Sequence, residues 1–203
     1  MAAVDLPKNV RISLERASIL LLEASEPGVE ILLQILAGFG VKSFHPCTTV
    51  GAARSVAERT KLDLIVAEIE LGDPEVDGLD FVHWLRRSGI DQNALCPVIL
   101  LSGHTTNGRV QRARDCGADF IVAKPLVPGV LLQRVIWVAR DTRQVVETSD
   151  YIGPDRRHRN LGPPIGMEGR RATDLTGDIG AALEENMSQD EIDNFLTPTR
   201  ALR

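Results

Sequence analysis

The stretch Leu62-Asp63-Leu64-Ile65-Val66-Ala67-Glu68 decides the fold, because it joins an apolar run to one terminal carboxylate. A short apolar run rich in branched side chains is typical of a buried β-strand. Three further segments have the same form, each with a polar residue at or just after its end: Ile19-Leu20-Leu21-Leu22-Glu23, Val98-Ile99-Leu100-Leu101-Ser102, and Phe120-Ile121-Val122-Ala123 before Lys124.

Helical patterns separate these strands. Ser25-Glu26-Pro27 combines a capping hydroxyl, an acidic residue and a proline, which predicts the start of the first helix. Similar patterns predict four more helices: one capped by Thr48 or Thr49, one over Gly78–Ser88, one opened by Thr105 or Thr106, and one from about Pro128 to Arg143.

Strand and helix alternate five times, with Val41–Cys47 as a weaker strand. This alternation predicts an α/β fold in which helices cover both faces of a doubly wound parallel sheet. We expect a lead-in over residues 1–16, a folded domain over residues 17–143 and a tail over residues 144–203. Gly, Pro, Arg and Asp dominate the tail to about Gly180, so we expect it to be largely irregular and without a core of its own.

Composition limits the classes of function. The net charge is −5 and 43% of the residues are apolar, so no bulk charge favours DNA or an anionic membrane. No apolar run approaches the roughly 20 residues that span a bilayer. Cys47, Cys96 and Cys116 form no CxxC pair, which indicates core cysteines in a reducing compartment. We therefore expect a cytoplasmic protein, and the histidine spacing predicts no metal site.

These segments resemble the receiver domains of two-component response regulators, over roughly Ala17 to Asp141. The local signatures occur in order: Asp63 to Glu68, Asp77-Gly78-Leu79, Pro97 to Gly103, and Gly117-Ala118-Asp119 before Lys124-Pro125. The resemblance implies a flavodoxin-like fold with strand order 2-1-3-4-5.

The resemblance also implies a phospho-acceptor pocket. In that family two acidic residues hold Mg²⁺, an aspartate accepts a phosphoryl group, and a Ser/Thr and a lysine assist. Two positions depart from the pattern, since Ala24 replaces the second acidic residue and Ile121 replaces the aromatic that often reports the switch. The corresponding residues here form a degenerate pocket of Glu23, Glu68, Ser102 and Lys124.

These departures predict a pseudo-receiver whose phosphorylation chemistry is lost. Mg²⁺ needs near-octahedral oxygen ligands, so Ala24 weakens its site. Glutamate is one methylene longer than aspartate, and misplacing a reacting oxygen by about 1 Å can cost roughly 10²-fold in rate. We expect Glu68 to place a fixed negative charge near Lys124. An inherited ion pair without a signalling role and a phosphorylatable regulator with an unusual acceptor at Glu68 or a neighbour remain as alternatives.

A first tail signal is the arginine pair of Gly153-Pro154-Asp155-Arg156-Arg157, repeated as Gly166-Met167-Glu168-Gly169-Arg170-Arg171. Guanidinium groups bind guanine edges and phosphates through paired hydrogen bonds, and they stack on rings. The segment resembles the arginine-rich tails of CheY-like proteins that bind cyclic di-GMP. That resemblance implies a ligand site of Tyr151, Asp155, Arg156, Arg157, Arg170 and Arg171. A solvated tail is the alternative, and acidic residues nearby offset the arginines too closely for strong DNA binding.

A second tail signal lies in Met187-Ser188-Gln189-Asp190-Glu191-Ile192-Asp193-Asn194-Phe195-Leu196. Ser188 and Glu191 form a capping box, which predicts a helix over residues 188–196. Its apolar face is Ile192, Phe195 and Leu196 at helical spacing, and such a short helix needs a groove to pack against. The sequence is similar to the flagellar switch peptide that docks on the fourth helix, fifth strand and fifth helix of a receiver. Docking on this chain's own receiver, docking on another protein and a frayed end all remain open.

The leading interpretation is therefore a non-enzymatic signalling module of the two-component or chemotaxis type. We expect partners among receivers, histidine kinases or flagellar-motor components, and cyclic di-GMP as a ligand of the tail. The alternatives are a phosphorylatable regulator and a scaffold without a small ligand that dimerises through the face of its fourth helix, fifth strand and fifth helix.

Overall fold

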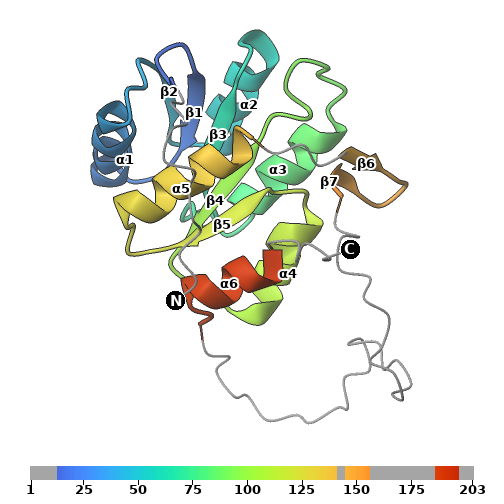
Figure 1. Ribbon diagram of the computed structural model, residues 1–203. Coiled ribbons are helices and arrows are strands. Elements are labelled where there is room, and N and C mark those ends of the chain that lie inside the picture. Colours follow the sequence, from blue (N-terminus) through green and yellow to red (C-terminus); the bar gives the residue numbers. More distant parts are fainter. Residues whose placement is uncertain (1–12, 141–144, 156–185, 197–203) are drawn as a thin grey trace, which may run out of the picture.

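A computed structural model describes residues 13–140, 145–155 and 186–196, with residues 194–196 described by their backbone alone. Its main sheet has five parallel strands in the order β2-β1-β3-β4-β5, so the predicted fold class and strand order are confirmed (Figure 1). The strands are β1 (Ser18–Leu22), β2 (Ser43–Cys47), β3 (Leu64–Glu68), β4 (Val98–Ser102) and β5 (Phe120–Ala123).

Helices cover both faces of this sheet (Figure 1). Side chains alternate along a strand, so Leu20 and Leu22 of β1 pack on one face while Ile19 and Leu21 pack on the other. This two-sided burial explains why the strands are continuous apolar runs. The face that contains Ile19 is covered by α1 (Glu26–Gly38) and α5 (Pro128–Val138). The opposite face is covered by α2 (Val50–Arg59), α3 (Gly78–Arg87) and α4 (Asn107–Asp115).

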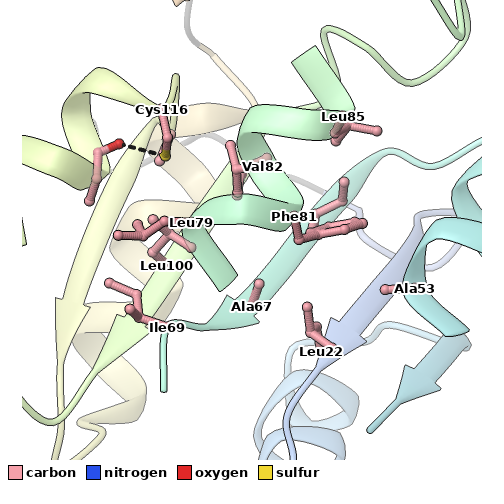
Figure 2. Packing of buried hydrophobic residues seen from close by; sticks show 14 of the residues in the cluster. Leu22, Ala53, Ala67, Ile69, Leu79, Phe81, Val82, Leu85, Leu100 and Cys116 are labelled. Atoms are coloured by element: carbon pink, nitrogen blue, oxygen red, sulfur yellow. Dashed lines mark hydrogen bonds between the residues drawn. The ribbon is translucent and has the colours of Figure 1, made fainter. Parts of the chain in front are cut away.

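Buried side chains between α3 and the sheet hold the central strand β3 in position. Figure 2 shows Leu79, Phe81 and Val82 of α3 pointing toward the sheet, where Ala67 and Leu100 lie. The approach is closest where α3 begins, because a Cβ atom on Gly78 would lie 2.1 Å from the carbonyl oxygen of Glu68. A glycine is therefore required beside the end of β3.

Helix starts follow the predicted caps only in part. Ser25 and Thr49 accept hydrogen bonds from the first turns of α1 and α2, as the sequence predicts. Thr106 precedes α4 without a side-chain cap, and the hydroxyl of Thr105 is bonded to the tail instead. The helix α5 ends at Val138, before the predicted end at Arg143.

The tail contributes three elements: β6 (Val145–Glu147), β7 (Ile152–Pro154) and α6 (Gln189–Leu196). The antiparallel hairpin of β6 and β7 was not expected from the composition of this segment. It packs on Gly117, where φ is +95° and a Cβ atom would lie 2.3 Å from the carbonyl oxygen of Ile152. Within the three described ranges, no helix has both the length and the apolar character needed to cross a membrane.

Candidate functional site

The carboxyl edge of the sheet gathers the four residues of the predicted pocket. Glu68 and Ser102 end β3 and β4, while Glu23 and Lys124 directly follow β1 and β5. Parallel strands end at the same edge, so the sequence correctly indicated that the four residues lie near one another. Their contacts, however, divide them into two separate networks.

The first network joins Lys124 to two carboxylates. The Nζ atom of Lys124 lies 3.0 Å from Oε2 of Glu23 and 2.5 Å from Oε1 of Glu68. Both glutamate side chains are nearly inaccessible, with 2% and 11% exposure, whereas Lys124 is 28% exposed. One ammonium group therefore bridges two buried acids that come from different strands.

Burial controls the charge of this network. Burial, together with the hydrogen bond to Glu23, raises the pKa of Glu68 to about 7, although Lys124 acts in the opposite direction. Burial would also raise the pKa of Glu23, but hydrogen bonds from Glu68, Lys124 and Ser25 outweigh it and lower that pKa. The two acids thus share a proton near neutral pH, mainly on Glu68, and the expected fixed charge on Glu68 is complete only at higher pH.

Glu23 is held from both sides. Its Oε1 atom accepts hydrogen bonds from the backbone nitrogen and the hydroxyl of Ser25, at 3.1 and 2.9 Å, while Oε2 faces Lys124. The neighbouring Ala24 adds only a methyl group. This donor set does not fit Mg²⁺, because the cationic lysine occupies the carboxylate that a metal would use.

The second network belongs to Ser102. Its hydroxyl lies 3.0 Å from Oε1 of Glu70 and 2.8 Å from the carbonyl oxygen of His104. Glu70 in turn is paired with Arg109 of α4, and Nδ1 of His104 lies 3.8 Å from the same carboxylate. Ser102 thus contacts a different carboxylate from the one that Lys124 holds.

Glu70 and Arg109 were not among the residues that the sequence singled out. A usable signal was the Glu68-Ile69-Glu70 spacing. Side chains two apart in an extended segment point to the same side, so Glu70 continues the side on which Glu68 lies. No group of three or more His, Cys, Asp or Glu side chains within the described part of the chain is placed to hold a metal ion.

The tail residues predicted to bind a nucleotide are only partly described. Tyr151 is 9% exposed and its hydroxyl donates to the carbonyl oxygen of Pro154 at 2.7 Å, so its ring stabilises the hairpin. A cavity of about 200 Å³ lies between the hairpin and the amino edge of the sheet, with Arg86 and Asp119 among its lining residues. Asp155 ends the described hairpin, and four predicted ligand residues lie outside the described ranges: Arg156, Arg157, Arg170 and Arg171.

The predicted docking helix lies on this chain's own folded domain, against β5. Ser188 and Glu191 form the expected capping box. Ile192 is completely buried and joins the core on the side of α4. Phe195 and Leu196 belong to the α6 backbone, and their side chains lie outside the description. Arg134 of α5 and Gln189 of α6, which sequence reasoning did not single out, both contribute to this contact.

The comparisons with known proteins agree with this architecture. A family model described as the response regulator receiver domain matches residues 19–136, which is more than half of the 203 residues. The match runs from β1 into α5, so β6, β7 and α6 lie beyond it. The sensory/regulatory protein RpfC of Xanthomonas campestris pv. campestris is 27% identical over 112 residues, covering 55% of this chain and 15% of RpfC. The chain thus spans only a small part of that relative.

Solved structures show the same fold. The signal receiver domain of a histidine kinase from Syntrophus aciditrophicus has a TM-score of 0.54 and 27% identity, covering 66% of this chain and 98% of that one. The chemotaxis protein CheY4 of Vibrio cholerae has a TM-score of 0.54 and 22% identity, covering 60% of this chain and 98% of that one. At that identity, the second likeness shows the fold alone.

Proposed function

The chain belongs to the response regulator receiver family, and from this premise we propose that it is a receiver that signals through protein contacts without phosphoryl transfer. One observation carries this proposal. The two side chains that would hold a phosphoryl group each hold a carboxylate already: Lys124 binds Glu68, and Ser102 binds Glu70. Glu68 and Glu70 together occupy the two side chains, Lys124 and Ser102, that a single phosphoryl group would contact.

The chemistry at Glu68 supports the same proposal. A nucleophilic carboxylate must be ionised and aligned with the phosphoryl donor. With its pKa raised to about 7 by burial and by Glu23, Glu68 is partly protonated at neutral pH. The lysine that would neutralise an incoming phosphoryl group is engaged by two acids. We therefore propose a non-enzymatic module that uses no Mg²⁺, with other signalling proteins as its partners.

Phosphorylation can be tested directly. The full chain is incubated with acetyl phosphate and Mg²⁺, and intact mass spectrometry measures phosphoryl addition, while NMR follows the Lys124 and Ser102 amides during beryllofluoride titration. We expect no mass increment and no saturable shifts in the wild type. The matched control is the double variant Ala24→Asp with Glu68→Asp, which restores the second Mg²⁺-binding acid and the aspartate acceptor of the family. Phosphoryl transfer to the wild-type chain would instead establish the alternative, a regulator with an unusual acceptor.

A second candidate function concerns the tail. Asp155 directly follows β7, whose Ile152 and Gly153 lie against Gly117, so the Arg156-Arg157 pair begins one residue after an anchored strand. We propose that this arginine-rich segment binds cyclic di-GMP, with Tyr151 supporting the hairpin rather than stacking on the base. Calorimetry on the full chain tests this. The Arg156→Ala, Arg157→Ala double variant should lose binding, and Arg140→Ala serves as an arginine control on the receiver. No heat at tens of micromolar ligand with the wild type would reject it.

The cysteines support a cytoplasmic location. Cys47, Cys96 and Cys116 are buried and unpaired. Free cysteines are typical of a reducing compartment. We propose that the protein acts in the cytoplasm, where the kinases and receivers that it is expected to contact are also found.

A further inference from the structure

The helix α6 lies against the edge strand β5, near α4 (Figure 1). Its binding site, here called the α6 groove, consists of Thr105, the backbone of Ile121 and Ala123, and Arg134. This is the face expected from sequence to serve dimerisation or partner docking. Because α6 occupies it, neither event can use this face while the helix remains in place.

A single side chain completes the edge of the sheet. The Gln189 amide donates from Nε2 to the carbonyl oxygen of Ile121 at 2.9 Å, and its Oε1 accepts from the backbone nitrogen of Ala123 at 2.7 Å. As an end strand, β5 has outward-facing backbone groups that would otherwise need water or a new strand. The Gln189 side chain therefore makes the donor and acceptor hydrogen bonds with β5 that the backbone of a neighbouring strand would make.

Two further contacts give the groove its specificity. Ile192 is completely buried, which makes it the apolar anchor of the helix. One residue later, Asp193 pairs with Arg134, whose guanidinium carbon also lies 5.3 Å from the ring centre of Phe120. Arg134 itself is only 7% exposed, so the ion pair is shielded from solvent. The groove thus selects a helix with a glutamine, an apolar residue three positions on and an acid four positions on.

The segment that enters α6 is clamped by Thr105. The backbone nitrogen of Met187 donates to the Thr105 carbonyl oxygen at 2.7 Å, and the Thr105 hydroxyl donates to the Met187 carbonyl oxygen at 2.6 Å. Asn186 adds a side-chain bond to the Thr105 nitrogen at 3.0 Å. These bonds, like those of Gln189, are local to α6 and its approach, and none depends on the rest of the tail.

The sequence separation between the hairpin and α6 is long enough for the helix to reach the groove of a second copy. Residues 156–185 connect the hairpin to the approach of α6, and a chain of that length reaches at most about 100 Å when extended. An isolated helix of eight residues is unstable in water, so a released α6 requires a groove. Every copy of the chain carries both the groove and the helix that fits it.

We propose that α6 is exchanged between two copies of this chain, each helix filling the groove of the other. Every contact of the cis form is regained, and the reciprocal arrangement closes with two-fold symmetry. Only the tether distinguishes the two forms. Tethering gives an effective concentration of about millimolar, so the monomer prevails at micromolar concentration until the cis contact is opened.

A pair of charge reversals tests the exchange on the full chain. Arg134→Glu places two acids together in cis, and Asp193→Arg places two bases together in cis. When the two variants are mixed, both exchanged contacts become complementary. In the first, the acid that replaces Arg134 in one chain meets the base that replaces Asp193 in the other. The second exchanged contact pairs the native Arg134 of one chain with the native Asp193 of the other. The double variant, with both changes in one chain, restores the ion pair in cis and is the matched control.

We expect each single variant and the double variant to be monomeric, and the mixture to form a 1:1 heterodimer. Native mass spectrometry and light scattering at about 100 µM, tenfold below the effective concentration in cis, make the measurement. A mixture that remains monomeric would overturn the exchange. If Arg134→Glu does not fold, Thr105→Val replaces it as the groove variant. The native α6 of the Thr105→Val variant must then bind the intact groove of the Asp193→Arg variant. The absence of that complex also overturns the proposal.

Discussion

The Glu23–Glu68–Lys124 network and the α6 groove both rest on an ion pair between distant segments, yet they are held in different ways. Glu68 ends the central strand β3 and Lys124 follows β5, so both belong to the continuous main sheet. Arg134 and Asp193 join the receiver to α6, which packs on the edge strand β5, and we expect such a peripheral element to open locally before the sheet does. The first region therefore sets one conformation, and the second is where an equilibrium can be shifted.

The largest effect is expected from Lys124→Ala. The change leaves the buried Glu23 without its cation, and breaking a buried ion pair costs about 3 to 5 kcal/mol. Urea denaturation at about pH 8, where Glu68 of the wild type is mostly ionised, measures the loss. The matched control is Lys42→Ala, whose pair with Glu15 is exposed and contributes at most about 1 kcal/mol. Equal losses in the two variants would contradict the assigned role of the buried network.

A smaller effect is expected from pH. Because the pKa of Glu68 is raised to about 7 in the folded protein, this group stabilises the fold fully at acidic pH and loses that contribution as pH rises through 7. Relative to Glu68→Gln, the wild type should lose about 1 to 3 kcal/mol of unfolding free energy between about pH 5 and pH 8. Denaturation across that range measures it. The pH dependence of the unfolding free energy of Glu58→Gln, a change at an exposed residue, should parallel that of the wild type. If the Glu68→Gln curve were also parallel to the wild type, the raised pKa of Glu68 would be disproved.

The α6 groove should respond locally rather than globally. Ile192→Ala removes a buried anchor, and such a change costs about 2 kcal/mol or more. Hydrogen exchange of the Ala123 amide, which Gln189 protects, should speed up roughly tenfold or more, since about 1.4 kcal/mol is tenfold in an equilibrium constant. Amides in the middle of β3 should not change. The half-exposed Ile31→Ala is the control, and a loss of protection throughout the sheet would mean that α6 is part of the global fold.

The smallest effect is expected from Gln189→Ala. It leaves the anchor and the ion pair in place and removes two hydrogen bonds to β5, worth about 1 kcal/mol each. The Ala123 amide loses its own acceptor and should exchange faster, whereas the release of α6 should increase less than in Ile192→Ala. Gln111→Ala, on the neighbouring α4, should leave that amide unchanged. An Ala123 amide insensitive to Gln189→Ala would show that β5 does not depend on this side chain.

Part of the site was predictable because it follows from the ends of strands. Glu68 and Lys124 end regular apolar runs, so their meeting was expected from the parallel sheet. Glu70 lies in a loop rich in Gly, Pro and acids, where only its two-residue spacing from Glu68 distinguishes it from the other carboxylates. Its partner Arg109 comes from a helix whose position on the sheet only packing defines. The hairpin was missed for a similar reason, since its two strands have three residues each and are stabilised through Gly117 rather than through their own pattern.

What the sequence by itself determined was the receiver architecture, the convergence of four side chains at one edge and the existence of a capped helix near the end of the chain. These follow from local periodicity and from the rule that parallel strands end together. Only the tertiary structure decided that Ser102 belongs to Glu70, that Glu23 and Glu68 share Lys124, and that α6 covers β5. Those outcomes depend on burial, which sets proton affinity, and on which unpaired backbone groups remain at the edge of the folded sheet.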